Sequence, residues 1–316
     1  MNALFEHNFV MFKMDFPTPP RRAIWVLLLL FAGTFAFGIE TVRIATFNVR
    51  NYLIEDRRVD GRWRSQYPKP EAEKKAVWEI IGSVAPDILV LQEMGTPAFL
   101  EELRADLEEM GIAYAYADVI EGADEKRHLA ILSNYAYDLS EGFRELDFPY
   151  FGERIPVKRG LLEARFEIEG YTFTVFGVHL KSRYTDNRED PDSVRRRRGE
   201  ARVSRNYIRE RFPRETDPDY LIVGDFNDTR RSSTLNYFLS VSDRELTRMV
   251  PATDSRGETW TYYYASDDVY SRIDFLLATP SLLRRVVGGE GHIVDGDAAL
   301  RASDHRMVYL DLRVGD

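Results

Sequence analysis

Short hydrophobic runs separated by polar turns occur along the chain from position 42 onward. Each run has the length of a β-strand, and many are bounded by the glycine, asparagine and aspartate residues that favour turns. Glu169-Gly170 separates two adjacent runs and predicts a hairpin there. The predicted strands are Val42–Phe47, Asp87–Leu91, Ala113–Val119, His128–Ser133, Gly160–Ile168, Tyr171–Leu180, Tyr220–Val223, Glu258–Tyr262, Arg272–Leu277 and Met307–Leu312.

Three longer segments alternate with these runs and are predicted to be helices. The first, Pro70–Val84, has proline at its first position and two glutamates in its first turn, where the helix dipole favours negative charge. The other two are Thr96–Glu109 and the long charged segment Ser193–Phe212. The segment Asp56–Lys69 is charged and aromatic without a regular period, so we expect it to be a loop.

The order of these elements predicts an α/β fold. Strands dominate, helices are interleaved with them, and several neighbouring strands are joined as hairpins. We expect a four-layer α/β sandwich, in which two mixed β-sheets pack face to face and the helices lie outside. The chain of 316 residues contains no Ser/Gly-rich linker, repeat or low-complexity tract, which favours a single domain from position 39 to position 316.

The N-terminal segment has the features of a secretory signal peptide. Arg21 and Arg22 precede the apolar run Ala23–Phe37, and Ala36-Phe37-Gly38 offers small residues for cleavage. The apolar run, about 15 residues, is shorter than the roughly 20 that a membrane-spanning helix needs. The sequence therefore predicts a signal peptide at 1–38 and an exported protein, periplasmic or extracellular, with no membrane span after cleavage. An uncleaved membrane anchor is the alternative.

Composition narrows the chemistry that the chain can perform. The sequence contains no cysteine, which excludes disulfides, thiolate nucleophiles and cysteine-bound metal sites. The formal net charge is −9, whereas domains that bind nucleic acid tightly are usually basic. A protein of this charge can still act on phosphates through a locally positive cleft, above all if it recruits a cation.

Polar residues suited to acid–base chemistry and metal binding lie at the ends of predicted strands. If these ends converge, Glu93 and Asp304 offer carboxylate oxygens beside the amide of Asn48, a donor set that suits Mg²⁺ or Mn²⁺ better than zinc. Two histidines and further aspartates are then left for proton transfer and phosphate binding. The strand-end residues are Asn48, Glu93, His179, Asp225, Asn227, Asp274, Asp304 and His305.

Each of these residues, taken alone, also has an ordinary structural interpretation. The corner Asp225-Phe226-Asn227 fits a turn that hydrogen-bonds its own backbone. A strand-end glutamate such as Glu93 is usually solvated, and His179 fits a core histidine. The pair Asp304-His305 fits an exposed segment before the last strand. The order of the residues along the chain is what favours the functional interpretation.

Six short motifs resemble, in sequence and in order, those of the endonuclease/exonuclease/phosphatase superfamily. This superfamily includes deoxyribonuclease I, apurinic endonucleases, bacterial sphingomyelinases and inositol polyphosphate 5-phosphatases. Each motif alone is weakly specific, but six in order are strongly specific, and the resemblance extends from position 42 to position 312. The motifs are Thr46-Phe47-Asn48, Leu91-Gln92-Glu93, Val178-His179-Leu180-Lys181-Ser182, Gly224-Asp225-Phe226-Asn227, Arg272-Ile273-Asp274-Phe275 and Ser303-Asp304-His305.

The resemblance implies a metal-dependent phosphoric ester hydrolase, with Mg²⁺ or Mn²⁺ as cofactor. It implies that Glu93 is the metal-ligand glutamate and that Asn48 and Asp304 complete or support the metal site. It also implies that Asp225 and Asn227 orient the attacking water and the scissile phosphate.

The resemblance gives roles to two histidines as well. His305 is implied to be the histidine held by Asp274, which fixes its tautomer and favours its charged form. His179 resembles a second histidine found in the deoxyribonuclease I and sphingomyelinase branches. The apurinic endonuclease branch tends to lack that histidine, so abasic-site repair is disfavoured. Lys181 joins the phosphate-binding donors if its side chain points inward.

One face of the predicted helix Ser193–Phe212 carries arginines spaced by three and four positions, called the arginine row below. Two interpretations are open. The row is a solvated face paired with Glu200, Glu210 and other acids, or it is a track, roughly 20 Å long, for the successive phosphates of a nucleic-acid strand. The arginine row comprises Arg195, Arg198, Arg202, Arg205 and Arg209.

Three functions are consistent with the sequence. The first is an exported nuclease acting on DNA or RNA, and the second is a phosphodiesterase or phosphatase for lipid headgroups (sphingomyelinase-like) or small phosphate esters. The third is a binding protein that has lost catalysis. No exposed aromatic hairpin for membrane docking is evident except Trp260–Tyr264, whose alternative is a buried strand with a substrate-stacking loop. The sequence does not indicate endo or exo action, or the oligomeric state.

Overall fold

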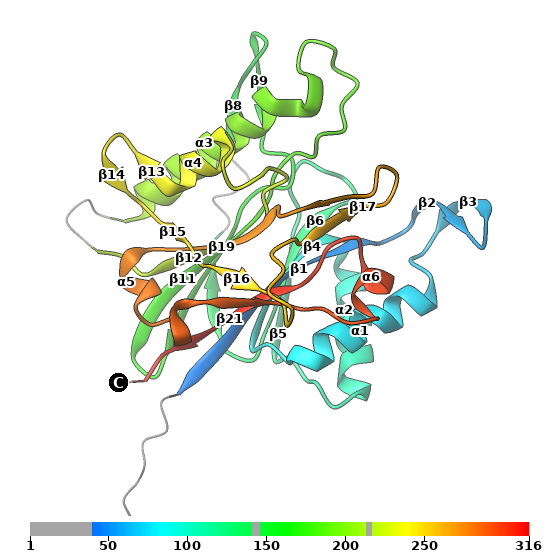
Figure 1. The fold of residues 1–316 in the computed structure, drawn as a ribbon, viewed down its shortest axis with the longest axis horizontal. Helices are drawn as coiled ribbons and strands as arrows, with labels where there is room; N and C mark the ends of the chain where they lie inside the picture. The colour runs from blue at the N-terminus through cyan, green and yellow to red at the C-terminus, as the bar shows by residue number, and fades with distance from the viewer. Residues whose placement is uncertain (1–39, 141–145, 213–216, 316) are drawn as a thin grey trace, which may run out of the picture. The chain divides into compact units, whose positions relative to one another are not determined.

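The computed structural model of the protein describes residues 40–140, 146–212 and 217–315 (Figure 1). These residues belong to one compact unit that spans 38–316. The predicted signal peptide, 1–38, lies outside the described residues and stays a prediction. Among the described residues, no helix has the length and apolar character that a membrane crossing requires.

The first of two large mixed sheets has seven strands and contains the N-terminal strand. β1 lies in its interior, antiparallel to β21 and parallel to β4. The runs near positions 42, 87, 128 and 307 are confirmed as strands, and the structure places them in one sheet. In spatial order its strands are β16 (Ala252–Thr253), β20 (Gly291–Ile293), β21 (Val308–Arg313), β1 (Thr41–Tyr52), β4 (Ile88–Met94), β6 (His128–Ser133) and β5 (Tyr116–Ile120).

The second sheet has six strands and includes the predicted hairpin around Glu169-Gly170. β10 and β11 form this hairpin, β11 runs parallel to β12, and β12 is antiparallel to β19. In spatial order its strands are β15 (Arg248–Met249), β19 (Asp274–Ala278), β12 (Tyr220–Asp225), β11 (Tyr171–His179), β10 (Leu162–Ile168) and β7 (Tyr137–Leu139).

The two sheets pack face to face, and alternate side chains of the inner strands enter different cores. On β1, Val42 and Ile44 join the core between the sheets, whereas Ala45 and Phe47 join a second core beneath the helices of the first sheet. Successive side chains of a strand point to opposite faces. A strand buried on both faces therefore reads as a continuous hydrophobic run, as this one does.

Helices cover the outer face of each sheet, which confirms the predicted four-layer α/β sandwich (Figure 1). Leu100 and Leu103 of one helix pack into the core beneath the first sheet, and Ala201 and Ile208 of another pack with the core of the second. The helices on the first sheet are α1 (Glu71–Val84), α2 (Pro97–Glu109) and α6 (Ala299–Ala302); those on the second are α3 (Val194–Arg211) and α4 (Ser233–Leu239), and α5 (Pro280–Leu283) follows β19.

The prediction of a loop at Asp56–Lys69 is wrong, because this segment forms a two-stranded hairpin that projects from the sandwich (Figure 1). Asp60 and Gly61, with φ values of 49° and 77°, make its turn, and an Asp-Gly pair favours such two-residue turns. Every residue of its second strand is exposed, so no hydrophobic alternation marks it in the sequence. The paired short strands are β2 (Glu55–Val59) with β3 (Arg62–Tyr67), β8 (Asp147–Tyr150) with β9 (Glu153–Pro156), β13 (Ser240–Val241) with β14 (Arg244–Glu245), and β17 (Tyr262–Tyr264) with β18 (Val269–Ser271).

Candidate active site

The core between the two sheets becomes polar at one end of β1. The β1 side chains that face the second sheet are apolar at Val42 and Ile44 and polar at Thr46 and Asn48. The Asn48 side chain is buried, and its Nδ2 donates a hydrogen bond of 3.2 Å to Oδ2 of Asp225 on the second sheet. The candidate site therefore lies where the two sheets meet through polar rather than apolar side chains.

The register of the second sheet aligns three predicted catalytic residues, called the polar row below. The parallel pairing of β11 and β12 sets His179 opposite Asp225, and the antiparallel pairing of β12 and β19 sets Asp225 opposite Asp274. All three side chains are buried. The three residues lie far apart in the sequence, and the pairing of neighbouring strands brings them together.

Glu93 reaches the same place through a bulge in the first sheet. The pairing of β4 with its neighbours is irregular between Gln92 and Met94, and Glu93 has a φ of 61°. A bulge re-aims a side chain, and a positive φ at a residue other than glycine marks local strain of the kind found at functional sites. The Glu93 carboxylate accepts hydrogen bonds from the Asn51 N–H (2.9 Å) and from Nδ2 of Asn48 (3.4 Å).

Ser303 fixes the segment that carries the last two predicted residues. Its hydroxyl donates to the backbone oxygen of Asn48 (2.7 Å) and accepts from the backbone N–H of His305 (3.0 Å). Asp304 lines the pocket together with Glu93, and its Oδ2 lies 3.8 Å from Nε of Arg50. The sheet containing β1 therefore supports both carboxylates of the predicted metal site.

His305 forms the predicted pair with Asp274. Its Nδ1 lies 3.1 Å and 3.0 Å from the two carboxylate oxygens of Asp274. Burial alone lowers the pKa of His305, but Asp274 and Asp225 outweigh burial and raise the pKa to about 10. His305 is therefore an imidazolium at neutral pH, and its Nε2 lies 3.9 Å from Oδ2 of Asp225.

Asp225 is the most densely contacted carboxylate of the site. Its Oδ1 accepts from the Asn227 N–H (2.8 Å), so the corner is also the self-bonded turn that its sequence favours. Its Oδ2 accepts from Nδ2 of Asn227 (2.9 Å) and lies 3.5 Å from Nε2 of His179. Burial raises the pKa of Asp225 to about 7, although the charged His305 opposes this shift. A carboxylate poised near neutrality is suited to accept a proton.

His179 has the opposite charge state from His305. Burial first, then the positive charges of Arg159 and His305, hold the pKa of His179 well below its usual value. The ring is therefore neutral, and its Nε2 lies 3.8 Å from Oε1 of Glu93. In the part of the chain that the structure describes, its Nδ1 has no hydrogen-bond partner.

Two sets of groups could hold a cation. Ligand atoms of Asp225, Asp274 and His305 lie within 4.8 Å of one another. However, His305 already uses Nδ1 to contact Asp274, and Asp274 does not line the pocket. Glu93 and Asp304 do line it, and their oxygens are the donors that Mg²⁺ and Mn²⁺ prefer. We therefore place the candidate metal site at Glu93 and Asp304.

Asn48 supports this metal site rather than completing it in the arrangement seen here. Its Nδ2 bridges Glu93 and Asp225, while its Oδ1 accepts from the backbone N–H of Arg50 at 3.0 Å. The amide oxygen is thus occupied by the chain itself. The predicted supporting role of Asn48 is the one that the hydrogen bonds favour.

The pocket at the site has a volume of about 470 Å³ and contains basic residues that sequence reasoning missed. Arg127, Lys158 and Arg159 lie in connecting segments outside the six motifs, so no motif or strand-end rule identified them. Lys181, predicted as a phosphate donor, does line the pocket, and its Nζ donates to the backbone oxygen of Ser182 at 3.0 Å. Burial, followed by Arg159 and Lys158, lowers the pKa of Lys181 to about 8.

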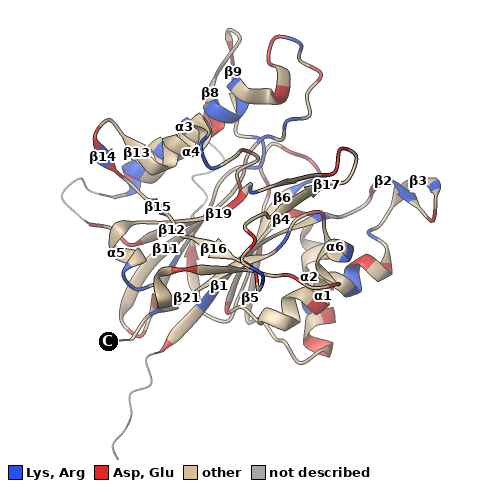
Figure 2. Ribbon diagram, in the orientation of Figure 1, with Lys and Arg blue, Asp and Glu red and all other residues tan. Residues whose placement is uncertain are grey.

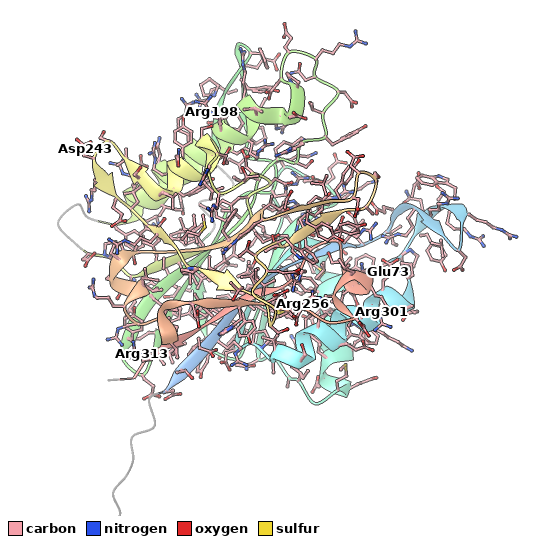
Figure 3. All side chains as sticks on the ribbon, in the orientation of Figure 1. Glu73, Arg198, Asp243, Arg256, Arg301 and Arg313 are labelled. Atoms are coloured by element: carbon pink, nitrogen blue, oxygen red, sulfur yellow. The ribbon has the colours of Figure 1, made fainter. Side chains whose placement is uncertain are left out.

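The arginine row lies outside this pocket. Arg195, Arg198 and Arg202 line a separate hollow of about 170 Å³, and Arg205 lies over the ring of Tyr237 on α4, 5.4 Å from its centroid. Figure 2 shows these basic positions along α3, and Figure 3 shows Arg198 on the side of the helix away from the sheets. The structure therefore brings together the strand-end residues but not the arginine row.

Comparisons with known proteins agree with this architecture. The endonuclease/exonuclease/phosphatase from Bacteroides vulgatus is 19% identical, with a TM-score of 0.59, over 86% of this chain and 98% of that one. A mutant of beta toxin from Staphylococcus aureus with bound magnesium ions is 13% identical, with a TM-score of 0.57, over 86% and 99%. Sphingomyelinase C from Streptomyces griseocarneus is 15% identical, with a TM-score of 0.57, over 86% and 99%. At these identities the likeness shows the fold alone.

No curated protein sequence matches the chain. The model of the Endonuclease/Exonuclease/phosphatase family, however, matches residues 45–305, which contain the strand-end residues from Asn48 to His305. The chain therefore belongs to the endonuclease/exonuclease/phosphatase family, whose members are phosphoric ester hydrolases that usually depend on a divalent metal.

Proposed function

We propose that the protein is an exported, Mg²⁺- or Mn²⁺-dependent phosphodiesterase that hydrolyses DNA or RNA. The proposed hydrolysis is supported by one observation: a pair of potential metal ligands and a pair of acid–base residues lie in the same pocket. Glu93 and Asp304 supply oxygen ligands, and beside them lie the buried Asp225, whose pKa is near neutrality, and the charged His305.

The chemistry follows from the protonation states of the site. A divalent cation held by Glu93 and Asp304, when bound, withdraws charge from the phosphate and favours attack by water. Asp225 accepts the proton of the attacking water, since its pKa lies near neutrality. His305, held by Asp274, presents a charged N–H that stabilises negative charge on the phosphate oxygens.

The proposed polyanionic substrate is supported by charge outside the metal site. None of the five arginines of the arginine row forms an ion pair with another described residue. Glu200, one of the acids expected to pair with them, is buried and accepts instead from the backbone N–H groups of Lys181 and Lys158. A row of arginines without acid partners in an acidic protein favours an external polyanion.

A lipid substrate is the second candidate. Trp63, on the projecting hairpin β2–β3, is 70% exposed, and Tyr67 on the same strand is 38% exposed. An exposed aromatic hairpin of this kind was not evident from the sequence. Tryptophan and tyrosine favour the interface of a membrane, and this hairpin offers a docking element for it.

The substrate is tested with the purified mature protein and Mg²⁺ or Mn²⁺, against plasmid DNA, RNA, sphingomyelin vesicles and bis-p-nitrophenyl phosphate. We expect hydrolysis of a nucleic acid and of the small ester, with the His305→Ala variant as the inactive control. Hydrolysis of sphingomyelin without nucleic acid would replace the nuclease with the lipid candidate. Failure on every substrate would favour a binding protein that has lost catalysis.

Export is tested separately, by expressing the full chain and fractionating the cells. We expect the protein in the periplasm or the medium, with a mature N-terminus close to position 39. Protein that stays in the cytoplasm with residues 1–38 intact would contradict export.

A further inference from the structure

One wall of the candidate site is basic and stands apart from the residues that carry the chemistry. It consists of Arg127, Lys158, Arg159 and Lys181, which line the same pocket as Glu93 and His305. We infer that these four side chains form an anion subsite that binds a second phosphate group of the substrate, next to the phosphate that is cleaved. This inference rests on the proposed function and names the kind of substrate that the site prefers.

The subsite is built around a buried carboxylate, Asp124. Its Oδ1 accepts the backbone N–H groups of Lys126 and Arg127, each at 3.2 Å. Its Oδ2 lies 3.1 Å from Nε of Arg159 and 3.5 Å from Nζ of Lys158. Burial raises the pKa of Asp124, but Arg159 and the donated N–H groups outweigh burial and keep the pKa below its usual value.

Further contacts hold the loop that carries Lys158 and Arg159. The backbone oxygen of Lys158 accepts from the Asp124 N–H at 2.7 Å. Gly122 allows the close approach, because a Cβ there would lie only 2.5 Å from the carbonyl carbon of Arg159. From the other side, the buried Glu200 accepts the backbone N–H groups of Lys158 (3.2 Å) and Lys181 (2.7 Å).

The positive charge of this wall exceeds what the protein itself neutralises. Glu55 pairs with Arg127 (2.9 Å), and among the described residues Lys158 and Arg159 share one ion-pair partner, Asp124. Nζ of Lys181 contacts only backbone and hydroxyl oxygens among the described residues.

Arg159 supplies the sharpest evidence for a missing anion. Its residue exposure is 5%, and within the described chain neither its Nε nor its Nη1 has a hydrogen-bond partner, since Nε approaches Asp124 without hydrogen-bond geometry. A buried guanidinium with unused N–H donors is costly unless a ligand satisfies it. Phosphate suits such a group, because its oxygens accept charge-assisted hydrogen bonds from guanidinium N–H groups.

The subsite differs from the arginine row in what it can recognise. The row is exposed on a helix face, which suits a long strand, whereas Arg159 is buried in the pocket that holds Glu93. The chemistry of the pocket fits a phosphate close to the scissile one. A terminal phosphate on the nucleotide beside the cleaved bond is such a group.

The test compares two dinucleotides that differ only in a terminal phosphate, pTpT and TpT. The native protein should hydrolyse pTpT with a kcat/KM at least about tenfold higher, the value expected for one or more charge-assisted hydrogen bonds. Lys158→Gln, at a partly exposed side chain, should reduce this preference severalfold, and Arg159→Lys should reduce it further by removing the guanidinium. Arg284→Gln, at a 70% exposed side chain outside the pocket, is the matched control and should keep the native preference.

Binding of inorganic phosphate, measured by calorimetry, gives a readout that does not depend on nuclease activity. The native protein and Arg284→Gln should bind phosphate alike, and Lys158→Gln and correctly folded Arg159→Lys should bind it about tenfold more weakly. If the protein cleaves neither dinucleotide but the binding differences persist, the nuclease proposal fails and the anion subsite stands. Equal phosphate binding by all four proteins, or an unchanged pTpT preference in both subsite variants, would overturn the subsite.

Discussion

The polar row at the strand ends and the arginine row on α3 are both regular patterns, but the structure gives them opposite surroundings. In the polar row, His179, Asp225 and Asp274 are buried in adjacent strands and contact one another or His305. In the arginine row, the side chains are largely exposed and make no ion pair within the described chain. Most buried polar groups are satisfied within the protein, so the partners of these residues are largely fixed before any substrate arrives. Exposed charges keep their binding capacity for an external partner.

The largest expected effect comes from breaking the network of the polar row. His305→Ala should reduce kcat by roughly 10²–10⁴-fold, because a positioned charged group beside the phosphate is lost. Asp274→Asn should also be costly, since Asp274 orients His305 and keeps it charged. Steady-state kinetics on bis-p-nitrophenyl phosphate measures both losses.

A variant that combines His305→Ala with Asp274→Asn tests whether the two residues act as a unit. Its loss of kcat should be much smaller than the product of the two single losses, because removing either partner already disables the other. If the two losses of kcat multiply, His305 and Asp274 act independently and do not form one catalytic network.

Substitution of a buried arginine next to the site should reduce the stability of the protein more than substitution of an exposed arginine. Arg306 donates to Asp254 Oδ2 at 2.8 Å, and both side chains are almost fully buried. Arg306→Gln should lower the free energy of unfolding by roughly 3 kcal/mol, because Asp254 loses its buried charged partner and, of its described contacts, keeps only those with the exposed Arg256 and two backbone N–H groups. Arg198→Gln, at an exposed position of the arginine row, should change it by less than about 0.5 kcal/mol. Urea unfolding measures both, and equal effects would remove the distinction between buried and exposed arginines.

The same ion pair predicts how stability depends on pH. Burial opposes ionisation of Asp254, but the hydrogen bond from Arg306 and the backbone N–H groups outweigh it and lower the pKa to about 2. A carboxyl group with a lowered folded-state pKa contributes stability above its unfolded pKa, which is about 4, and loses that contribution as the pH falls toward 2. Thermal unfolding at a series of pH values should show this loss of stability. The decrease in stability with falling pH should be smaller in Asp254→Asn than in the native protein.

The smallest expected effect concerns the arginine row. Changing Arg198, Arg202 and Arg205 together to Gln preserves helix propensity while it removes three charges. The activity on long DNA or RNA should fall relative to that on bis-p-nitrophenyl phosphate, and binding should depend less steeply on salt, because fewer counterions are released. A parallel loss on both substrates would make the row part of the fold or the site. No change on either would leave it a solvated face and favour the lipid or small-ester candidate.

The sequence predicted the core of the fold and the strand-end residues for related physical reasons. Runs buried on both faces, such as β1, are visible because burial requires continuous hydrophobicity. Asn48 and Asp225 stand out because they interrupt such runs, although each strand continues past the predicted end, to Tyr52 and to Asp225 itself. The exposed hairpin β2–β3 left no such pattern and was missed.

Apart from Lys181, the basic wall could not be predicted, because its members become neighbours only through tertiary contacts. Arg127 and Lys158 lie in separate connecting segments, and Asp124 and Glu200 hold these segments together. Charged residues in loops are usually solvated, so their composition alone carries no signal of a site. The unsatisfied guanidinium of Arg159 is visible only once the burial of its side chain is known.

Metal-dependent hydrolysis at Glu93 can be tested by measuring hydrolysis of bis-p-nitrophenyl phosphate with and without chelator. For the native protein, excess EDTA should abolish activity and added Mg²⁺ or Mn²⁺ should restore it. The circular dichroism spectrum should stay unchanged throughout, because the ligands lie on strands and loops that the two sheets already hold in place. Glu93→Gln should recover little activity at the same metal concentration. Full activity of the native protein in excess chelator, or full activity of Glu93→Gln with added metal, would show that hydrolysis does not depend on a metal held by Glu93.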